Sequence, residues 1–269
     1  MGQIVNIKNF NLYCGRYSQK ANPKTPEKEI GWHIEDNILE KLPVLALRNK
    51  SIGEKSSPPL LWKKDRNLFH AIGLTLETLK GWQAFRPEES NKIIDKLKDA
   101  LPKIVLRFQE DMHSYEVETL RDIMKLEQGD YDEVLQIVAK AVGKISAFKN
   151  DSTPMLGSKI MHFLYPEFFP VWDTAWIKNV CLKNENESLE EWFSERVEKR
   201  LSDKQEAVAE YMHYCALMLK DLDETGPREC NKIARALIGY SKIPNEVIYW
   251  HFYDISTLIF EFCLLGKHY

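Results

Sequence analysis

Residues 153–176 read TPMLGSKIMHFLYPEFFPVWDTAW, and this stretch decides both the fold and the chemistry expected of the chain. Pro154 and Gly157 are turn residues, and the apolar segment that follows predicts a helix over residues 158–165 with Ser158 at its start. Lys159 then falls in the first turn of that helix. Asp173 follows 14 positions later, after prolines that end the helix. The sequence thus places one lysine and one aspartate close together among large apolar residues.

The turn joins two predicted helices, because residues 131–148 before it also have helical periodicity. Free backbone N–H groups at the start of the second helix are a natural site for a phosphate. A lysine held against apolar surface has a lowered pKa, and a neutral amine is a nucleophile. An aspartate that caps the following helix stays ionised while it faces a cavity. From these residues alone, a solvated surface lysine beside a purely structural cap is an open alternative.

Outward from this stretch, the chain from residue 65 to 269 is mainly helical in pattern. Helices are expected within residues 65–85, 88–112 (interrupted at Pro102), 131–148, 202–222, 227–240 and 243–266. Residues 1–64 form an irregular N-terminal segment packed on this core, with short strands within residues 4–18 and a short helix broken near Pro43. The predicted fold class is therefore mainly α.

Composition limits the classes of function. The chain has 269 residues, 44% of them hydrophobic, which excludes a fully disordered protein, and no apolar run is long enough for a transmembrane helix. The five cysteines form no C-x-x-C pair and the seven histidines no H-x-x-x-H pair, so reduced thiols and no metal or cofactor are expected. The N-terminus has no signal-peptide pattern, which favours a cytoplasmic protein. We expect a monomer.

The segments PMLGSK (154–159) and FPVWD (169–173), separated by an apolar helix, resemble the core signature of the helix-hairpin-helix DNA glycosylases, in particular the 8-oxoguanine glycosylase-like branch. That family has a Pro-Gly-Val-Gly-x-Lys hairpin, a helix, and a Val-Pro-Val-Asp segment that enters another helix. Here Met155 stands where the family has glycine, and Trp172 is an additional residue. The resemblance implies a glycosylase-like helical bundle with its hairpin at residues 150–176.

The resemblance also implies roles for individual residues. Lys159 is the implied nucleophile on the sugar C1′, and Asp173 is the implied carboxylate that stabilises positive charge there. Pro154, Gly157 and Ser158 fall in the hairpin that holds a DNA phosphate. A flipped base needs aromatic walls and a proton donor or acceptor, and the candidates are Trp172, Trp250 and His162.

A basic helix face offers a surface for DNA despite the net charge of −3. Arg228, Lys232 and Arg235 are spaced i, i+4 and i+7, so a helix places them on one side. Acidic residues are concentrated elsewhere, in residues 183–198. Ordinary solvated helix faces are the alternative explanation of this pattern.

The sequence therefore predicts a DNA glycosylase that excises a modified base from double-stranded DNA and leaves an abasic site, with AP-lyase activity as an extension of the same lysine chemistry. On family grounds, the substrate class includes modified bases of foreign or phage DNA, which would make the protein a defence enzyme. The alternative is a non-catalytic helical module that binds DNA or protein. The sequence does not specify which base is removed.

Overall fold

The computed structural model describes residues 4–21, 39–52, 62–81, 85, 90–149, 153–173, 177, 206–241 and 254–268. Within these ranges every regular element is a helix and there is no strand, which confirms the prediction of a mainly α protein. None of the helices in these ranges combines the length and the apolar character needed to cross a membrane. Trp176, Trp250, Pro244 and the acidic stretch 183–198 lie outside the described residues.

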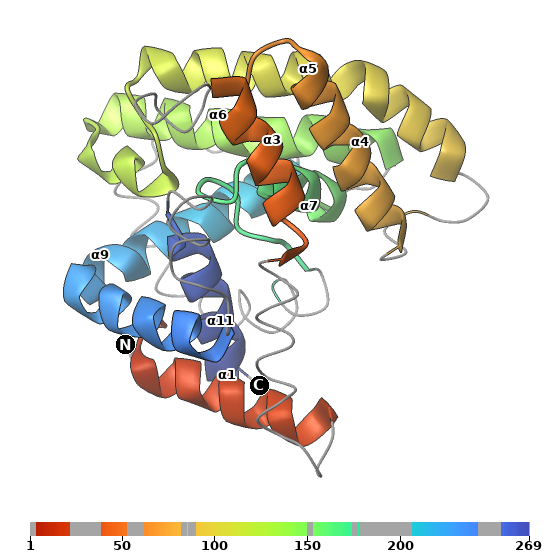
Figure 1. Cartoon of the computed structure of the whole chain (residues 1–269). Coiled ribbons are helices and arrows are strands. Elements are labelled where there is room, and N and C mark those ends of the chain that lie inside the picture. The colour runs from red at the N-terminus through yellow and green to blue at the C-terminus, as the bar shows by residue number, and fades with distance from the viewer. Residues whose placement is uncertain are drawn as a thin grey trace.

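One group of helices follows the order of the chain. α3 (Leu42–Ile52) packs on α4 (Arg66–Gly81), α4 on α5 (Ser90–Ser114), and α5 on α6 (Gln128–Ser146) (Figure 1). Two short 3₁₀ helices, η1 (Leu120–Lys125) and η2 (Ala147–Lys149), flank α6 in sequence. α7 (Met155–Leu164) packs against α6, α4 and α3, so the lysine–aspartate stretch starts inside this group.

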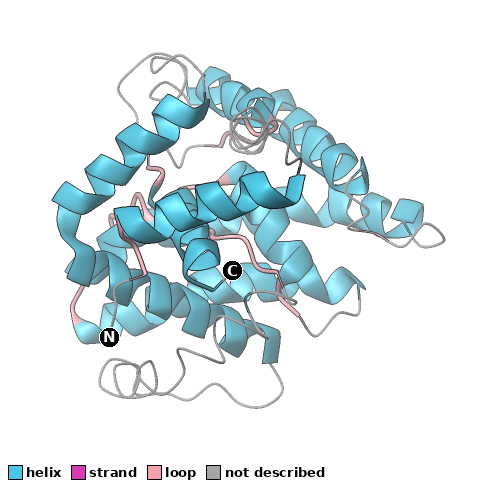
Figure 2. Ribbon diagram, turned by 90° about the horizontal axis from the view of Figure 1, so that it is seen from below, coloured by secondary structure: helices cyan, strands magenta, loops and turns pink. Residues whose placement is uncertain are grey.

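The second group brings the start and the end of the described chain together. α1 (Ile7–Ala21) lies along α11 (Ser256–His268), and both contact α9 (Glu206–Ser241) (Figure 1). α9 also packs on α6 and so joins the two groups. In the view from below, the loop segments run between helices that surround them (Figure 2).

The N-terminal segment is more regular than its sequence suggested. Short strands were expected within residues 4–18, but this part of the chain forms α1. The physical reason is that Phe10, Tyr13 and Cys14 are all buried and lie at helical spacing, with Tyr13 in ring contact with Phe262 of α11. The predicted break near Pro43 is present: Leu39 is helical, Glu40 and Lys41 form a turn, and α3 begins at Leu42. Pro43 lies in the first turn of α3, where it costs no hydrogen bond.

Two prolines behave differently in the longer helices. Pro102 was expected to interrupt its helix, yet α5 continues through it from Ser90 to Ser114. Residues on both sides of the proline, including Leu97 and Val105, are buried, and α5 packs on α4 and α6. α9 is bent where two helices were predicted, because Gly226 has φ 72° and ψ 166° and Pro227 opens the second half.

Candidate functional site

The hairpin before α7 is tighter than the sequence predicted. α7 begins at Met155 rather than Ser158, so Gly157 and Ser158 lie inside the helix and Lys159 falls in its second turn. The Gly157 N–H donates to Ser146 Oγ at the end of α6, at 3.0 Å. A Cβ on Gly157 would lie 2.1 Å from the backbone oxygen of Val142. Glycine is needed here because two helices approach closely, and not because of a positive φ.

Ser158 connects the start of α7 to the aspartate segment. Its hydroxyl donates to the Met155 carbonyl at 3.1 Å and accepts the N–H of Trp172 at 3.0 Å. Pro154, Gly157 and Ser158, the predicted phosphate contacts, are all buried. In this structure the Ser158 hydroxyl and the Gly157 amide hold α7 in place. The contact of all three residues with DNA stays a prediction.

The chain from Pro166 to Trp172, here called the anchored segment, is buried almost throughout but has no helix or strand of its own. Buried backbone groups need partners, and here other elements supply them one by one. The partners are Thr257 Oγ for Pro166 O (2.6 Å), Leu120 N for Glu167 O (3.1 Å), His162 Nδ1 for Phe169 O (2.5 Å), Tyr211 Oη for Pro170 O (2.7 Å), Glu261 Oε1 for Val171 N (2.5 Å) and Ser158 Oγ for Trp172 N.

Lys159 and Asp173 are brought together as predicted. Both residues are half-buried, and the Asp173 carboxylate is the charge that most favours the protonated form of Lys159. Burial lowers the pKa of the Lys159 amine below its ordinary value; Asp173 opposes this shift, and the nearby ammonium of Lys149 adds to it. The geometry thus gives a partly accessible amine that loses its proton more easily than a surface lysine, beside a carboxylate.

A second lysine–carboxylate pair has its lysine in the core and its carboxylate half-buried. Lys41 is 1% exposed, with its ammonium 5.5 Å from the centre of the Phe163 ring and within electrostatic reach of Glu261. Burial lowers the pKa of Lys41 to about 8, and burial raises the pKa of Glu261 to about 7. His162 is buried in the same region, and burial together with the charge of Lys41 lowers its pKa well below the ordinary value. His162 is therefore neutral, and its Nδ1–H donates a hydrogen bond to the Phe169 carbonyl oxygen.

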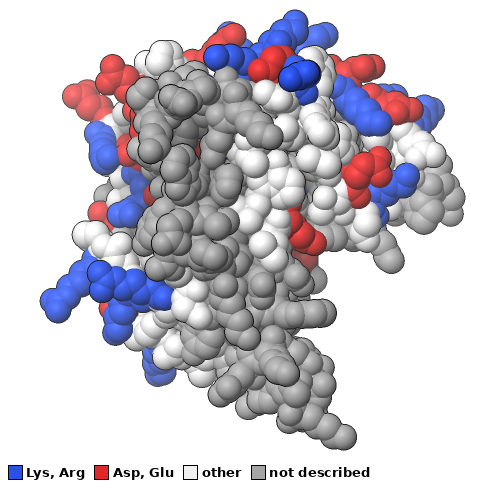
Figure 3. Space-filling model, in the orientation of Figure 1, with Lys and Arg blue, Asp and Glu red and all other residues white. Residues whose placement is uncertain are grey.

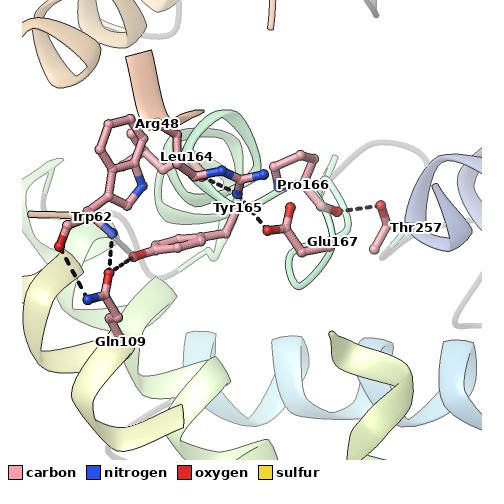
Figure 4. A network of polar contacts seen from close by, with 8 residues as sticks. All are labelled: Arg48, Trp62, Gln109, Leu164, Tyr165, Pro166, Glu167 and Thr257. Atoms are coloured by element: carbon pink, nitrogen blue, oxygen red, sulfur yellow. Dashed lines mark hydrogen bonds and ion pairs between the residues drawn. The ribbon is translucent and has the colours of Figure 1, made fainter. Parts of the chain in front are cut away.

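A buried ion pair fixes the start of the anchored segment. Arg48 of α3 donates from Nη1 to Glu167 Oε1 at 2.5 Å and to the Leu164 carbonyl at 3.2 Å (Figure 4). On the other side, the Tyr165 hydroxyl donates to Gln109 of α5, which also accepts the N–H of Trp62 (Figure 4). The chain between α7 and the aspartate is thus held from several directions.

The predicted base-pocket residues lie in different surroundings. Trp172 is fully buried and meets Tyr214 edge-on at 5.6 Å between ring centres. Stacking of its ring on a base would require Trp172 to leave this position. His162, which is 1% exposed, holds the Phe169 carbonyl. Trp250 lies outside the described residues.

The predicted basic face is present. Arg228, Lys232 and Arg235 are exposed and lie on the half of α9 that follows Gly226. Figure 3 shows Lys and Arg side chains gathered over this part of the molecule. Lys232 has Glu229 within 3.7 Å, and both side chains are partly or fully accessible, so this ion pair leaves the positive character of the face largely intact.

Metal and thiol chemistry finds no support in the described part of the chain. No group of three or more His, Cys, Asp or Glu residues there is placed to hold a metal ion. Cys14, Cys215, Cys230 and Cys263 are free and buried, and burial raises the pKa of each thiol.

Sequence analysis missed the residues that support the site from a distance, chiefly Lys41, Arg48, Glu167 and Glu261. One signal was present for Glu261, which is the only acidic residue in the otherwise apolar stretch from Ser256 to Gly266. A carboxylate in such a helix needs a buried partner. Its partners, Lys41 and the Val171 amide, are far away in sequence, so the pairing was not visible.

Comparison with protein-family models, with curated proteins and with solved structures finds no match for the chain.

Proposed function

We propose that the protein is a DNA N-glycosylase that removes a modified base from double-stranded DNA through Lys159 and Asp173. The observation that carries the proposal is that the Asp173 carboxylate lies within electrostatic reach of the Lys159 amine, whose pKa burial lowers. A structure with Lys159 and Asp173 on opposite sides of the molecule would contradict the proposal.

The arrangement suits the cleavage of an N-glycosidic bond. In the proposed reaction the neutral Lys159 Nζ attacks C1′ of the sugar, and the base departs with the electron pair of the broken C1′–N bond. Positive charge develops on the sugar, and the Asp173 carboxylate stabilises it in a site partly shielded from water. The lysine–sugar adduct rearranges to a Schiff base, which allows strand cleavage as a second step. Exposed Arg228, Lys232 and Arg235 would contact DNA phosphates.

A trapping experiment tests the proposal. Wild-type protein is incubated with duplexes that each carry one modified base, and borohydride is added to reduce any Schiff base to a stable adduct. We expect at least one duplex to yield an abasic site and a covalent protein–DNA product. Lys159→Gln is expected to lose the covalent product entirely, because an amide does not form a Schiff base.

Lys149→Gln is the matched control, because it removes a neighbouring lysine but leaves the nucleophile. Loss of the Lys149 charge raises the pKa of Lys159, so trapping is expected to persist with its pH profile moved to higher pH. If wild type and Lys159→Gln both leave every duplex intact, the enzymatic proposal fails. Retained DNA binding in that case would favour the non-catalytic binding module.

A further inference from the structure

Glu261 occupies an unusual position for a carboxylate. It lies in the middle of α11, between Phe260 and Phe262, both of which are buried. Its Oε1 accepts the N–H of Val171 at 2.5 Å, although the two residues are 90 positions apart. Val171 is two residues before Asp173, so the Glu261 carboxylate binds the backbone just before the proposed catalytic residue.

The charge of Glu261 is balanced from the opposite side. Lys41, which precedes α3, is the charge that most favours ionised Glu261, and burial of both groups opposes their ionised forms. A hydrogen bond from an amide to an ionised carboxylate is roughly twice as strong as one between neutral groups. The buried ammonium therefore supports the form of Glu261 that holds Val171 most firmly.

The neighbouring contacts act on the same short piece of chain. Tyr211 of α9 donates to the Pro170 carbonyl at 2.7 Å, and Ser158 of α7 accepts the Trp172 N–H at 3.0 Å. Three consecutive residues are thus bound by three different helices immediately before Asp173. Ser158 precedes Lys159, so the same set of contacts fixes the lysine and the aspartate relative to each other.

We infer that Glu261 is a positioning residue, which holds Val171 and thereby places the Asp173 carboxylate against Lys159. The inference rests on the proposed function for its catalytic meaning, but the placement itself is a property of the chain. The contact that carries the proposed effect of Glu261 is its hydrogen bond with the Val171 N–H. Its effect is transmitted through two residues of backbone.

Two double variants separate the effect of the hydrogen bond from the effect of the two charges. Lys41→Met with Glu261→Leu removes both charges and the acceptor for Val171, and apolar replacement of a buried ion pair is often neutral for stability. Lys41→Met with Glu261→Gln also removes both charges but keeps an oxygen that accepts the Val171 N–H. The two proteins therefore differ mainly in the acceptor that holds the segment.

The first readout is the single-turnover rate of base excision at saturating DNA. The Leu-containing double variant is expected to lose roughly 10- to 100-fold in rate with little change in DNA affinity, the size of effect that follows small misplacement of a catalytic group. The Gln-containing double variant is expected to stay within about threefold of wild type, because it retains the acceptor. Asp221→Asn, a carboxylate that binds the amides of Ile4 and Val5 instead, serves as a control for loss of stability alone.

The second readout needs no glycosylase activity. Lys159 is modified with a limiting amount of an amine-reactive ester across a range of pH, and its labelling is followed by peptide mass spectrometry. Asp173 raises the pKa of Lys159, and Lys149 lowers it. Displacement of Asp173 in the Leu-containing variant should therefore shift the labelling midpoint of Lys159 to lower pH, while the Gln-containing variant keeps the wild-type midpoint. Labelling of Lys149 in the same samples reports any change in lysine reactivity that is not specific to Lys159.

These readouts distinguish the two proposals. A wild-type labelling midpoint in a folded Leu-containing variant would overturn the positioning inference, whatever the enzymatic result. Absence of excision by wild-type protein, with the expected shift in labelling, would end the proposed function but not the placement of Asp173 by Glu261. If either double variant fails to fold, Tyr211→Phe replaces it, because it deletes one hydroxyl contact to the same segment and is expected to shift the Lys159 midpoint in the same direction.

Discussion

Among the described residues, Lys41 and Lys159 lie against apolar surroundings, and each has a carboxylate within electrostatic reach. Lys159 and Asp173 are both partly accessible, whereas Lys41 is 1% exposed and its carboxylate partner, Glu261, is half-buried. Accessibility separates their roles. A reactive amine must meet a substrate, so Lys159 suits chemistry, while the inaccessible Lys41 suits the support of a neighbouring carboxylate.

The Lys41–Glu261 pair makes the free energy of unfolding depend on pH in two ranges. The pKa of Glu261 is raised from 4.5 to about 7, so between these values the folded state binds more protons and stability falls as pH rises. The pKa of Lys41 is lowered from 10.5 to about 8, so between these values the unfolded state binds more protons and stability rises with pH. The contribution of the pair is therefore smallest between the two folded-state pKa values.

Urea unfolding at about pH 5, 7.5 and 9.5 checks this dependence. The quantity of interest is the stability of wild type minus that of the double variant Lys41→Met with Glu261→Leu. Titrating groups that the pair does not influence cancel in this difference, whereas His162, whose pKa the charge of Lys41 lowers, does not. The difference should be lowest near neutral pH. An equal difference at all three values would contradict the assigned pKa shifts.

At the residue scale, the sequence predicted the pair that is close in sequence, Lys159 with Asp173, but not the pair that is far apart in sequence, Lys41 with Glu261. Lys159 and Asp173 lie within one short stretch, and a helix followed by a proline-containing return brings them together locally. Glu261 and Lys41 are separated by most of the chain and meet only after α11 and α3 are in place. Local pattern carries no information about such a meeting, although an isolated acid in an apolar helix indicates that a partner exists.

At the scale of elements, α7 depends on one close contact with α6. Gly157 lies inside α7 rather than in the turn, and its missing side chain lets the helix rest on the backbone of Val142. Ser146 then satisfies the Gly157 amide. The glycine was correctly identified as special, but its reason was a contact between helices, which a reading of turn residues does not reveal.

Gly157→Ala is expected to destabilise the protein by about 1–3 kcal/mol, because the added methyl group meets backbone that has little room to move. Gly73→Ala in α4 is the matched control, since nothing lies within 4 Å of its added Cβ. That change should be neutral or stabilise the helix by up to about 1 kcal/mol. Thermal or urea unfolding measures both; an equal effect of the two substitutions would show that α7 does not rest on α6 in this way.

Helix boundaries show where local patterns fail. Residues 4–18 were interpreted as short strands because their apolar residues alternate loosely, yet α1 forms because α11 offers a long apolar surface to pack on. Pro102 was expected to break a helix that packing on both sides keeps continuous. In both cases tertiary contacts outweigh local preference, and these contacts could not be deduced from a single sequence.

At the scale of the whole molecule, the N-terminal segment closes against the C-terminal part of the fold. The Asp221 carboxylate of α9 accepts the N–H groups of Ile4 and Val5 at 2.5 and 2.6 Å. A Cβ on Gly266 of α11 would lie 1.9 Å from the backbone oxygen of Asn9, so α1 and α11 are in close contact. The first helix is therefore part of the core rather than an appendage.

Asp221→Asn is expected to cost about 1–3 kcal/mol, because an amide has one oxygen and leaves one of the two N–H groups without its acceptor. Hydrogen exchange at Ile4 and Val5 should become faster before any change in α6 or α7. Asp223→Asn, an exposed position on the same helix, is the control and should change stability by less than about 0.5 kcal/mol. Equal exchange rates in both variants would argue against this attachment.

The anchored segment has a consequence for biogenesis. It receives contacts from α7, which is translated shortly before it, and from α9 and α11, which leave the ribosome much later. A nascent chain that already contains Lys159 and Asp173 still lacks Tyr211, Thr257 and Glu261. Under the proposed function, the chain would thus stay inert during synthesis and become competent only when its last described helix docks. Ribosome-stalled chains of increasing length would reveal that moment.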